Sequence, residues 1–121
     1  MTEIQNPKQY NLENRTFEFA KRVRKFVKKL PRTISNIEDG KQAVRSSGSI
    51  GANYIEANES LSKKDFVMRI KICRKEAKET CYWLKLVDVN NILNLENENK
   101  LLISEATELM KIFGAILEKC K

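Results

Sequence analysis

The sequence predicts an all-α protein, an antiparallel up-down bundle of four helices. Four segments carry apolar residues at a period near 3.6, the pattern of amphipathic helices. The breaks between them are short, and short connections place consecutive helices side by side. Two prolines and four glycines in 121 residues leave little room for turns, so the helices must be long. Residues 11–121 form one bundle domain, and we expect residues 1–10 to be a flexible tail.

The first helix is predicted over residues 11–30, ending before Pro31. Its apolar stripe alternates spacings of four and three residues, and the opposite arc is rich in Lys and Arg. The stripe consists of Leu12, Thr16, Phe19, Val23, Phe26 and Leu30. Phe17 falls on the polar side, where an aromatic side chain needs a partner.

The second helix is predicted over residues 36–58, with Ser35 and Glu38 as a capping box. Glycine inside a helix costs about 1 kcal/mol relative to alanine. We interpret Gly48 and Gly51 as positions where a neighbouring helix comes close. A local break near Gly48 is the alternative.

The third helix is predicted over residues 63–90, with Ser62 and Asp65 as its N-terminal cap pair, and the fourth over residues 96–120. The third helix has one apolar stripe that should face the bundle core. That stripe consists of Phe66, Ile70, Cys73, Ala77, Thr80, Cys81 and Leu84.

A second apolar stripe lies on the other side of the third helix. An isolated four-helix bundle covers one side of each helix, so the second side predicts an interface between copies of the chain. The predicted interface residues are Met68, Ile72, Trp83 and Leu86 of this stripe, together with Phe17 on the polar side of the first helix. In the alternative interpretation, apolar loop residues at 92–95 fold back over Trp83 and Leu86.

The positive charge is concentrated in one stretch. The chain carries a net charge of +7, and residues 15–32 hold eight basic residues against one acidic residue, while the remainder is balanced. In the third helix a basic run is partly offset by Glu76 and Glu79, which we expect to form ordinary surface pairs with the lysines around them. The eight candidate nucleic-acid-binding residues are Arg15, Lys21, Arg22, Arg24, Lys25, Lys28, Lys29 and Arg32. Like charges on one helix face repel, and a polyanion relieves that repulsion. We predict binding to RNA or DNA without sequence specificity, because no aromatic platform accompanies the charges. An acidic protein partner and a merely solvated face are the alternatives.

Several classes of function find no support in the sequence. The chain has no histidine, and it lacks a glycine-rich phosphate loop and any metal-ligand spacing. We therefore expect no enzyme activity, cofactor, metal or small-molecule substrate. The three cysteines, Cys73, Cys81 and Cys120, are interpreted as reduced apolar residues. No apolar run is long enough for a membrane span or a secretory signal, so we expect a cytoplasmic protein without membrane contact.

Two linked segments, RSSGSIGANYIEA at residues 45–57 and KKDFVMRIKICRKEAKETCYWLKL at residues 63–86, carry a family resemblance. They resemble the bacterial four-helix-bundle family that is also called the 23S rRNA intervening-sequence protein family. The matching positions are Ser49, Ile50, Asn53, Glu56, Asp65, Phe66, Glu79, Thr80, Tyr82, Trp83 and Leu84. Ala57-Asn58 stands where many relatives have an Ala/Glu-Gly turn, which leaves the corner between the second and third helices open.

The resemblance implies a homo-oligomeric ring, pentameric in known relatives, and genes sometimes found inside ribosomal RNA intervening sequences. A similar bundle is an accessory subunit of a retroelement reverse transcriptase, in which a basic surface is thought to bind nucleic acid. The family brings no catalytic residues.

Overall fold

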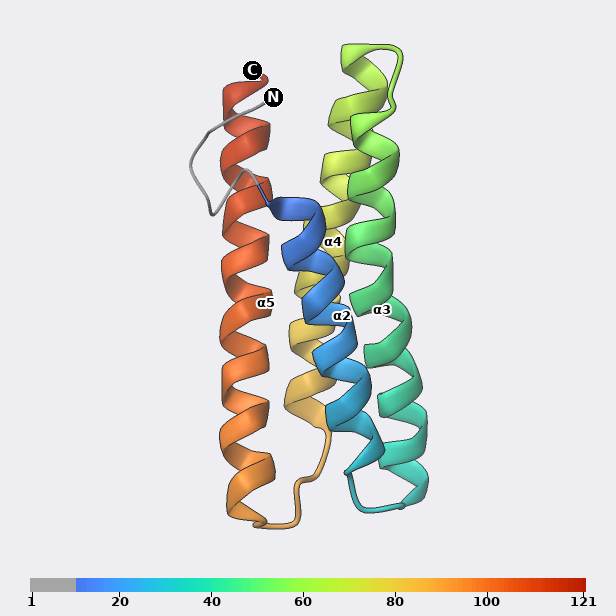
Figure 1. Cartoon of the computed structure of the whole chain (residues 1–121), viewed down its shortest axis with the longest axis vertical. Coiled ribbons are helices and arrows are strands. Elements are labelled where there is room, and N and C mark those ends of the chain that lie inside the picture. The colour runs from blue at the N-terminus through green and yellow to red at the C-terminus, as the bar shows by residue number, and fades with distance from the viewer. Residues whose placement is uncertain (1–10) are drawn as a thin grey trace.

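Four helices make up the part of the chain that the structure, a computed structural model, describes, which is residues 11–121. They are α2 (Leu12–Lys28), α3 (Ile34–Asn58), α4 (Lys63–Leu86) and α5 (Leu93–Lys119) (Figure 1). The prediction of an all-α protein with four long helices is confirmed. The tail predicted at residues 1–10 lies outside the described residues.

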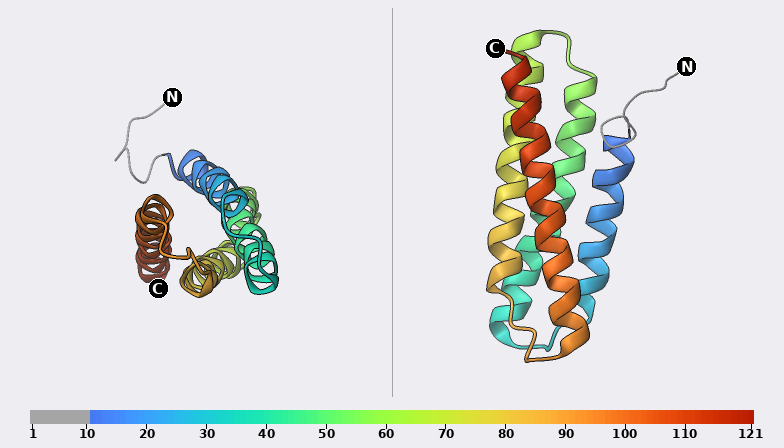
Figure 2. Two further views of the ribbon diagram at one scale, coloured as in Figure 1. Left: turned by 90° about the horizontal axis from the view of Figure 1, so that it is seen from below. Right: turned by 90° about the vertical axis from the view of Figure 1, so that its left-hand side faces the viewer.

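The four helices follow one another around a common axis. Each helix packs on the next in the chain, and α5 returns to α2, so that α4 lies across the bundle from α2 (Figure 2). The α2–α3 and α4–α5 connections lie at one end, and the α3–α4 connection lies at the other (Figure 1). Across the α4–α5 seam, Asn99 Nδ2 donates to the carbonyl of Leu84, and Gly114 lies beside Arg74.

A single apolar core runs between the helices. The predicted stripe of α2 is buried along its whole length, and it meets buried side chains from the other three helices. The largest of these fully buried partners are Ile50, Ile70, Leu84, Leu102, Leu109 and Phe113. None of the helices in residues 11–121 is both long enough and apolar enough to cross a membrane.

Glycines of α3 let α2 approach closely. A Cβ atom at Gly51 would lie 2.8 Å from Oγ1 of Thr16, and one at Gly40 would lie 2.9 Å from Cγ1 of Val27. Both distances are shorter than van der Waals contact, so these positions need glycine. Because α3 is continuous through Gly48 and Gly51, the local break is wrong. The close-approach interpretation is confirmed at Gly51, whereas an added Cβ at Gly48 would meet only the guanidinium of Arg24, at 3.2 Å.

The start of α3 differs from the prediction. Thr33 is the N-cap residue, in an extended conformation, and its hydroxyl accepts a hydrogen bond from the backbone N–H of Asn36. The capping box of Ser35 and Glu38 is therefore wrong, because α3 already begins at Ile34. The other predicted cap is confirmed, since Ser62 accepts from the N–H of Asp65 at 3.1 Å.

The connection between α4 and α5 is longer and lies earlier in the chain than predicted. α4 ends at Leu86 rather than near residue 90, and α5 begins at Leu93 rather than near residue 96. Asn90 and Asn91 have φ angles of 55° and 59°, a left-handed conformation that asparagine tolerates better than most residues. α4 stops at Val87, which is extended, and the turn at Asn90 and Asn91 lets α5 start three residues early.

Asn36 joins the α4–α5 connection to the α2–α3 connection, which lies at the same end of the bundle. Its side chain is 3% exposed and donates to the carbonyls of Pro31 at 3.0 Å and Asp88 at 2.9 Å. Its Oδ1 also accepts from the N–H of Asp88 at 2.8 Å. One side chain thus ties the loop before α3 to the loop after α4.

Candidate nucleic-acid interface

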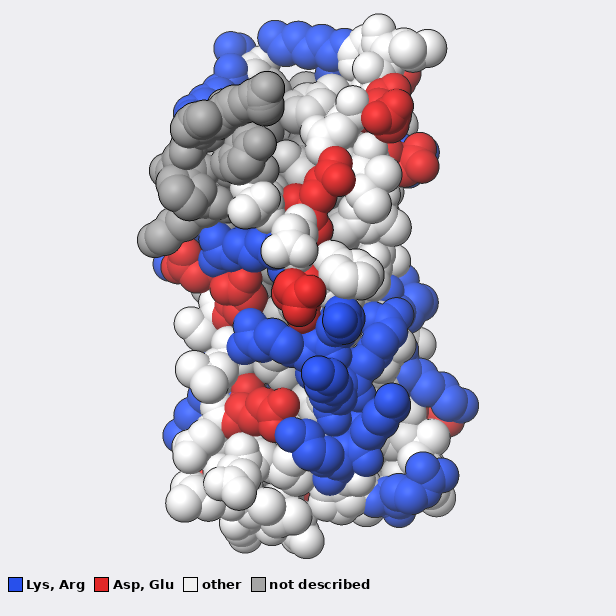
Figure 3. All heavy atoms as spheres, in the orientation of Figure 1, with Lys and Arg blue, Asp and Glu red and all other residues white. Residues whose placement is uncertain are grey.

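The solvent-facing side of α2 is the most concentrated basic surface in the view of Figure 3, where Lys and Arg side chains gather in its lower half. Seven of the eight candidate binding residues are exposed. We call these seven the α2 basic face: Lys21, Arg22, Arg24, Lys25, Lys28, Lys29 and Arg32. They come from successive turns of one helix and from the residues that follow it, so they form one continuous surface.

Arg15 is the eighth candidate, and it is already bound within the protein. Its guanidinium donates to both carboxylate oxygens of Glu105, at 2.7 and 3.0 Å. The two side chains are only 22% and 18% exposed. The hydrogen bond that Arg15 donates to Glu105 raises the pKa of Arg15 above its ordinary value. Arg15 therefore holds α2 to α5, and we leave it out of the candidate surface.

Three members of the α2 basic face have contacts inside the protein. Lys29 pairs with Glu98 at 2.7 Å, and the Nζ of Lys21 lies 5.4 Å from the centre of the Phe17 ring. Arg24 donates to the carbonyl of Ala20 at 3.2 Å, a neutral partner that leaves its charge unbalanced. These contacts are exposed and weak.

The other four members have no ion pair and no side-chain hydrogen bond with any residue in 11–121. They are Arg22, Lys25, Lys28 and Arg32. Their charges face solvent uncompensated, which is the arrangement that attracts a polyanion.

Phe17 lies beside this face, at the seam between α2 and α3. It is 58% exposed, and Ile55 of α3 is 51% exposed. Both line a shallow, mainly apolar hollow of about 390 Å³ that also includes Gly48 and Gly51. Phe17 therefore finds Lys21 as a partner on one side and an open apolar hollow on the other.

The other four predicted interface residues lie elsewhere, on α4. Met68 is 51% exposed and Leu86 is 48% exposed, while Ile72 and Trp83 are half-buried. The exposure of Leu86 shows that the following loop does not fold over it. The structure thus separates Phe17, at the α2–α3 seam, from the other four residues on α4. Along α4, Met68 and Ile72 are about 16 Å from Trp83 and Leu86, with Lys75 and Glu79 between them.

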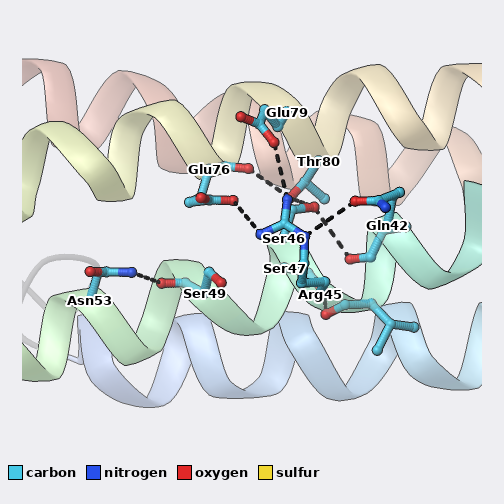
Figure 4. A network of polar contacts seen from close by, with 11 residues as sticks. Gln42, Arg45, Ser46, Ser47, Ser49, Asn53, Glu76, Glu79 and Thr80 are labelled. Carbon is cyan, nitrogen blue, oxygen red and sulfur yellow. Dashed lines mark hydrogen bonds and ion pairs between the residues drawn. The ribbon is translucent and has the colours of Figure 1, made fainter.

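A polar network joins α3 to α4, and the sequence did not reveal it (Figure 4). Arg45 reaches from α3 to Glu79 at 3.2 Å and to Glu76 at 3.6 Å. On sequence grounds, both carboxylates were expected to form surface pairs with the lysines around them in α4. The expected partner is wrong, because Glu76 and Glu79 are three residues apart and turn together toward α3. Glu79 does form an exposed ion pair, whereas Glu76 is buried.

Buried hydroxyl groups complete the same seam. The Oγ atoms of Ser46 and Thr80 are 2.8 Å apart, and neither residue is exposed. Thr80 also donates to the carbonyl of Glu76 at 2.8 Å, one turn earlier on α4. Nearby, Arg69 donates to Asn53 Oδ1 at 2.9 Å, which links α4 to α3 again. Small and hydroxyl residues in the second helix signalled close packing, but not these partners.

The cysteines have the surroundings of structural residues. Cys73 is fully buried, and its thiol donates to the carbonyl of Ile50. Burial raises the pKa of Cys73 to about 12, so the thiol stays protonated at neutral pH. Within residues 11–121, no three His, Cys, Asp or Glu side chains come together as a metal site would require.

Comparisons with known proteins agree with this architecture. A family model described as 23S rRNA-intervening sequence protein matches residues 8–115. A crystal structure of a protein of unknown function from the S23 ribosomal protein family, from Bacteroides thetaiotaomicron, is similar at 32% sequence identity and a TM-score of 0.71. That similarity covers 87% of this chain and 96% of the other. The search of curated proteins finds no match.

Proposed function

Because the chain belongs to the 23S rRNA-intervening sequence protein family, we propose that it is a non-enzymatic, homo-oligomeric protein whose α2 basic face binds RNA or DNA. The observation that carries the proposal is the set of cations on that face that pair with no residue in the range 11–121, Arg22, Lys25, Lys28 and Arg32. Phosphate contacts would release counterions from the nucleic acid, which supplies sequence-independent affinity.

The two apolar patches support assembly into a closed ring. In a cyclic oligomer of more than two copies, each interface joins two different surfaces, one from each neighbour. The first patch, with Phe17 and Ile55, lies at the seam of α2 and α3, and the second consists of the exposed apolar side chains along α4, from Met68 to Leu86. Contact between the first patch of one copy and the second patch of the next generates a ring. A pentamer is the size that the family resemblance favours.

A second candidate function is docking of an acidic protein segment. An apolar hollow of about 440 Å³ lies between the end of α2 and the start of α3. Apolar side chains, including Val27, Ile37 and Val44, line its floor, and Lys28 and Arg32 stand at its edge. An amphipathic acidic helix would place apolar side chains in this hollow and carboxylates against the cations.

RNA titrations at several salt concentrations test the first candidate. We expect a labelled RNA duplex to bind at low salt and to lose affinity with a log–log slope proportional to the number of phosphates contacted. Lys25→Gln with Lys28→Gln should weaken binding and reduce the slope by about two. The matched control is Lys41→Gln with Lys121→Gln, since these lysines pair with Glu38 and Glu118 on their own segments.

Affinity that does not depend on salt, or that is equal in the two double variants, would exclude phosphate binding by the α2 basic face. Binding of an acidic amphipathic peptide in the same hollow, lost in Val44→Glu, would then favour the docking function.

A further inference from the structure

A second group of cations lies across the bundle from the α2 basic face. It lines a hollow of about 500 Å³ at the seam of α4 and α5, together with Met110. We call these residues the α4–α5 basic surface: Lys71, Arg74, Lys75, Lys78 and Lys111. Figures 1 and 2 place α2 and α4 on opposite sides of the bundle axis, so the two basic surfaces face away from each other.

The α4–α5 basic surface carries uncompensated charge. All five side chains are exposed, and none forms an ion pair or a side-chain hydrogen bond with any other residue in the range 11–121. Glu76 and Glu79, the carboxylates nearest in sequence, are turned away to Arg45 on α3. On α5, Glu105 and Glu118 also bind cations elsewhere. The sequence suggests that Glu76 and Glu79 partly offset the basic charges of α4. On the side of α4 that faces the α4–α5 seam they do not.

The spacing of the lysines on α4 extends this surface along the bundle. Lysines recur every seven residues, so each stands about two turns, or about 10 Å, from the next on the same side of the helix. The row consists of Lys64, Lys71, Lys78 and Lys85, and all four are exposed. Its length of about 30 Å is close to one turn of a nucleic-acid duplex.

We propose that the α4–α5 basic surface is a second nucleic-acid-binding site, so that one protomer holds two nucleic-acid segments on opposite sides of the bundle. The inference rests on the proposed function, since it takes nucleic-acid phosphate as the ligand. Five cations around one hollow repel one another, and a phosphate backbone would relieve that repulsion as it would on α2. A short straight duplex cannot touch both surfaces, because the bundle lies between them. Two separate segments are therefore needed to fill both.

The experiment counts short RNA duplexes bound per protomer at low salt, with the full chain, and measures the salt slope. We expect two duplexes per protomer in the unaltered protein and half as many after Lys71→Gln with Lys78→Gln. Lys25→Gln with Lys28→Gln should halve the number in the same way, and the four-residue combination should abolish binding. The control Lys41→Gln with Lys121→Gln removes the same charge and should change neither the stoichiometry nor the slope by more than a small fraction.

A second readout is amine acetylation of the lysines, followed by mass spectrometry. Duplex should protect Lys71, Lys75 and Lys78 even in the Lys25→Gln, Lys28→Gln variant.

The outcomes separate this inference from the proposed function. If the Lys71→Gln, Lys78→Gln variant keeps its full stoichiometry and the α4 lysines acetylate equally with and without duplex, the second site is overturned and the α2 site stands. If only the α4 variant loses binding, the α2 site is wrong and the α4–α5 site stands. If the control loses as much as the α4 variant, overall charge explains the effect and the second site is overturned. Absence of any binding by the unaltered protein overturns both.

Discussion

Arg15, near the start of α2, donates hydrogen bonds to both carboxylate oxygens of Glu105, in the middle of α5. The N···O distances are 2.7 and 3.0 Å. The two residues are ninety positions apart, and their ion pair joins the first described helix to the last. A residue that belongs to the basic stretch by sequence therefore contributes to the closure of the bundle.

Arg15→Gln should lower the free energy of unfolding by about 1–3 kcal/mol, because it removes two charge-assisted hydrogen bonds and leaves Glu105 without its partner. RNA affinity should not change at equal folded concentration. Arg22→Gln is the matched control, with unchanged stability and weaker RNA binding. Urea unfolding and RNA titration measure the two effects, and a loss of RNA affinity in Arg15→Gln alone would return Arg15 to the binding surface.

Gly51→Ala should destabilise the protein by about 1–3 kcal/mol, because the added Cβ would overlap Oγ1 of buried Thr16. Gly114→Ala is the control within α5, where the nearest atom to an added Cβ is 3.9 Å away. There the gain in helix propensity should stabilise the protein by about 0.5–1 kcal/mol. Thermal unfolding of both variants tests whether Gly51 is closely packed and Gly114 is not. Equal shifts of the same sign in the two unfolding temperatures would contradict this difference.

Stability should fall as the pH rises from about 9 towards 12, because the pKa of the Cys73 thiol rises from an ordinary value of 9.0 to about 12 in the folded protein. In that window the unfolded chain releases the proton and the folded chain keeps it, so stability is lost with increasing pH at up to about 1.4 kcal/mol per unit. Burial also raises the pKa of Tyr54, which adds to the loss in the same direction.

The measurement is urea unfolding at several pH values from about 8 to about 11. Cys73→Ala should have a shallower pH dependence than the unaltered protein, and Cys120→Ala, at the end of α5, should keep the full slope. An identical slope in Cys73→Ala would show that the thiol is not the group responsible.

Phe17→Glu and Met68→Glu should each dissociate the oligomer while leaving the helical content unchanged, because both side chains are more than half exposed in one protomer. An equimolar mixture of the two variants should form a dimer, since one intact pair of patches remains between unlike partners. Leu101→Glu, at a 62% exposed position of α5, is the control. Light scattering measures the size, and a monomeric unaltered protein at micromolar concentration would refute the ring.

Periodicity was sufficient to predict which sides of the helices are buried. Every residue of the α2 stripe is in the core, because a spacing of three and four residues fixes the direction of a side chain around its own helix. The same reasoning identified the close approach at Gly51, since glycine within a helix is costly unless packing requires it.

What periodicity could not predict is which neighbouring helix stands in a given direction. Glu76 and Glu79 were assigned to their own helix because their partner, Arg45, lies more than thirty positions away in the sequence. Arg15 was grouped with its basic neighbours for the same reason. The position of the α3 N-cap also depended on the tertiary bonds of Asn36, which favour a helix that starts at Ile34.

The side chain of Asn36 makes the two ends of the bundle unequal. It fastens both loops at the end where α2 finishes, whereas α3 and α4 project beyond α2 at the opposite end (Figure 1). Local unfolding of α3 and α4 should therefore begin at the projecting tip and reach the end held by Asn36 last. The lysines and arginines near the end of α2 lie at the end of the bundle that Asn36 holds together. Their positions are therefore largely fixed before binding, and a polyanion would lose little conformational entropy in ordering them.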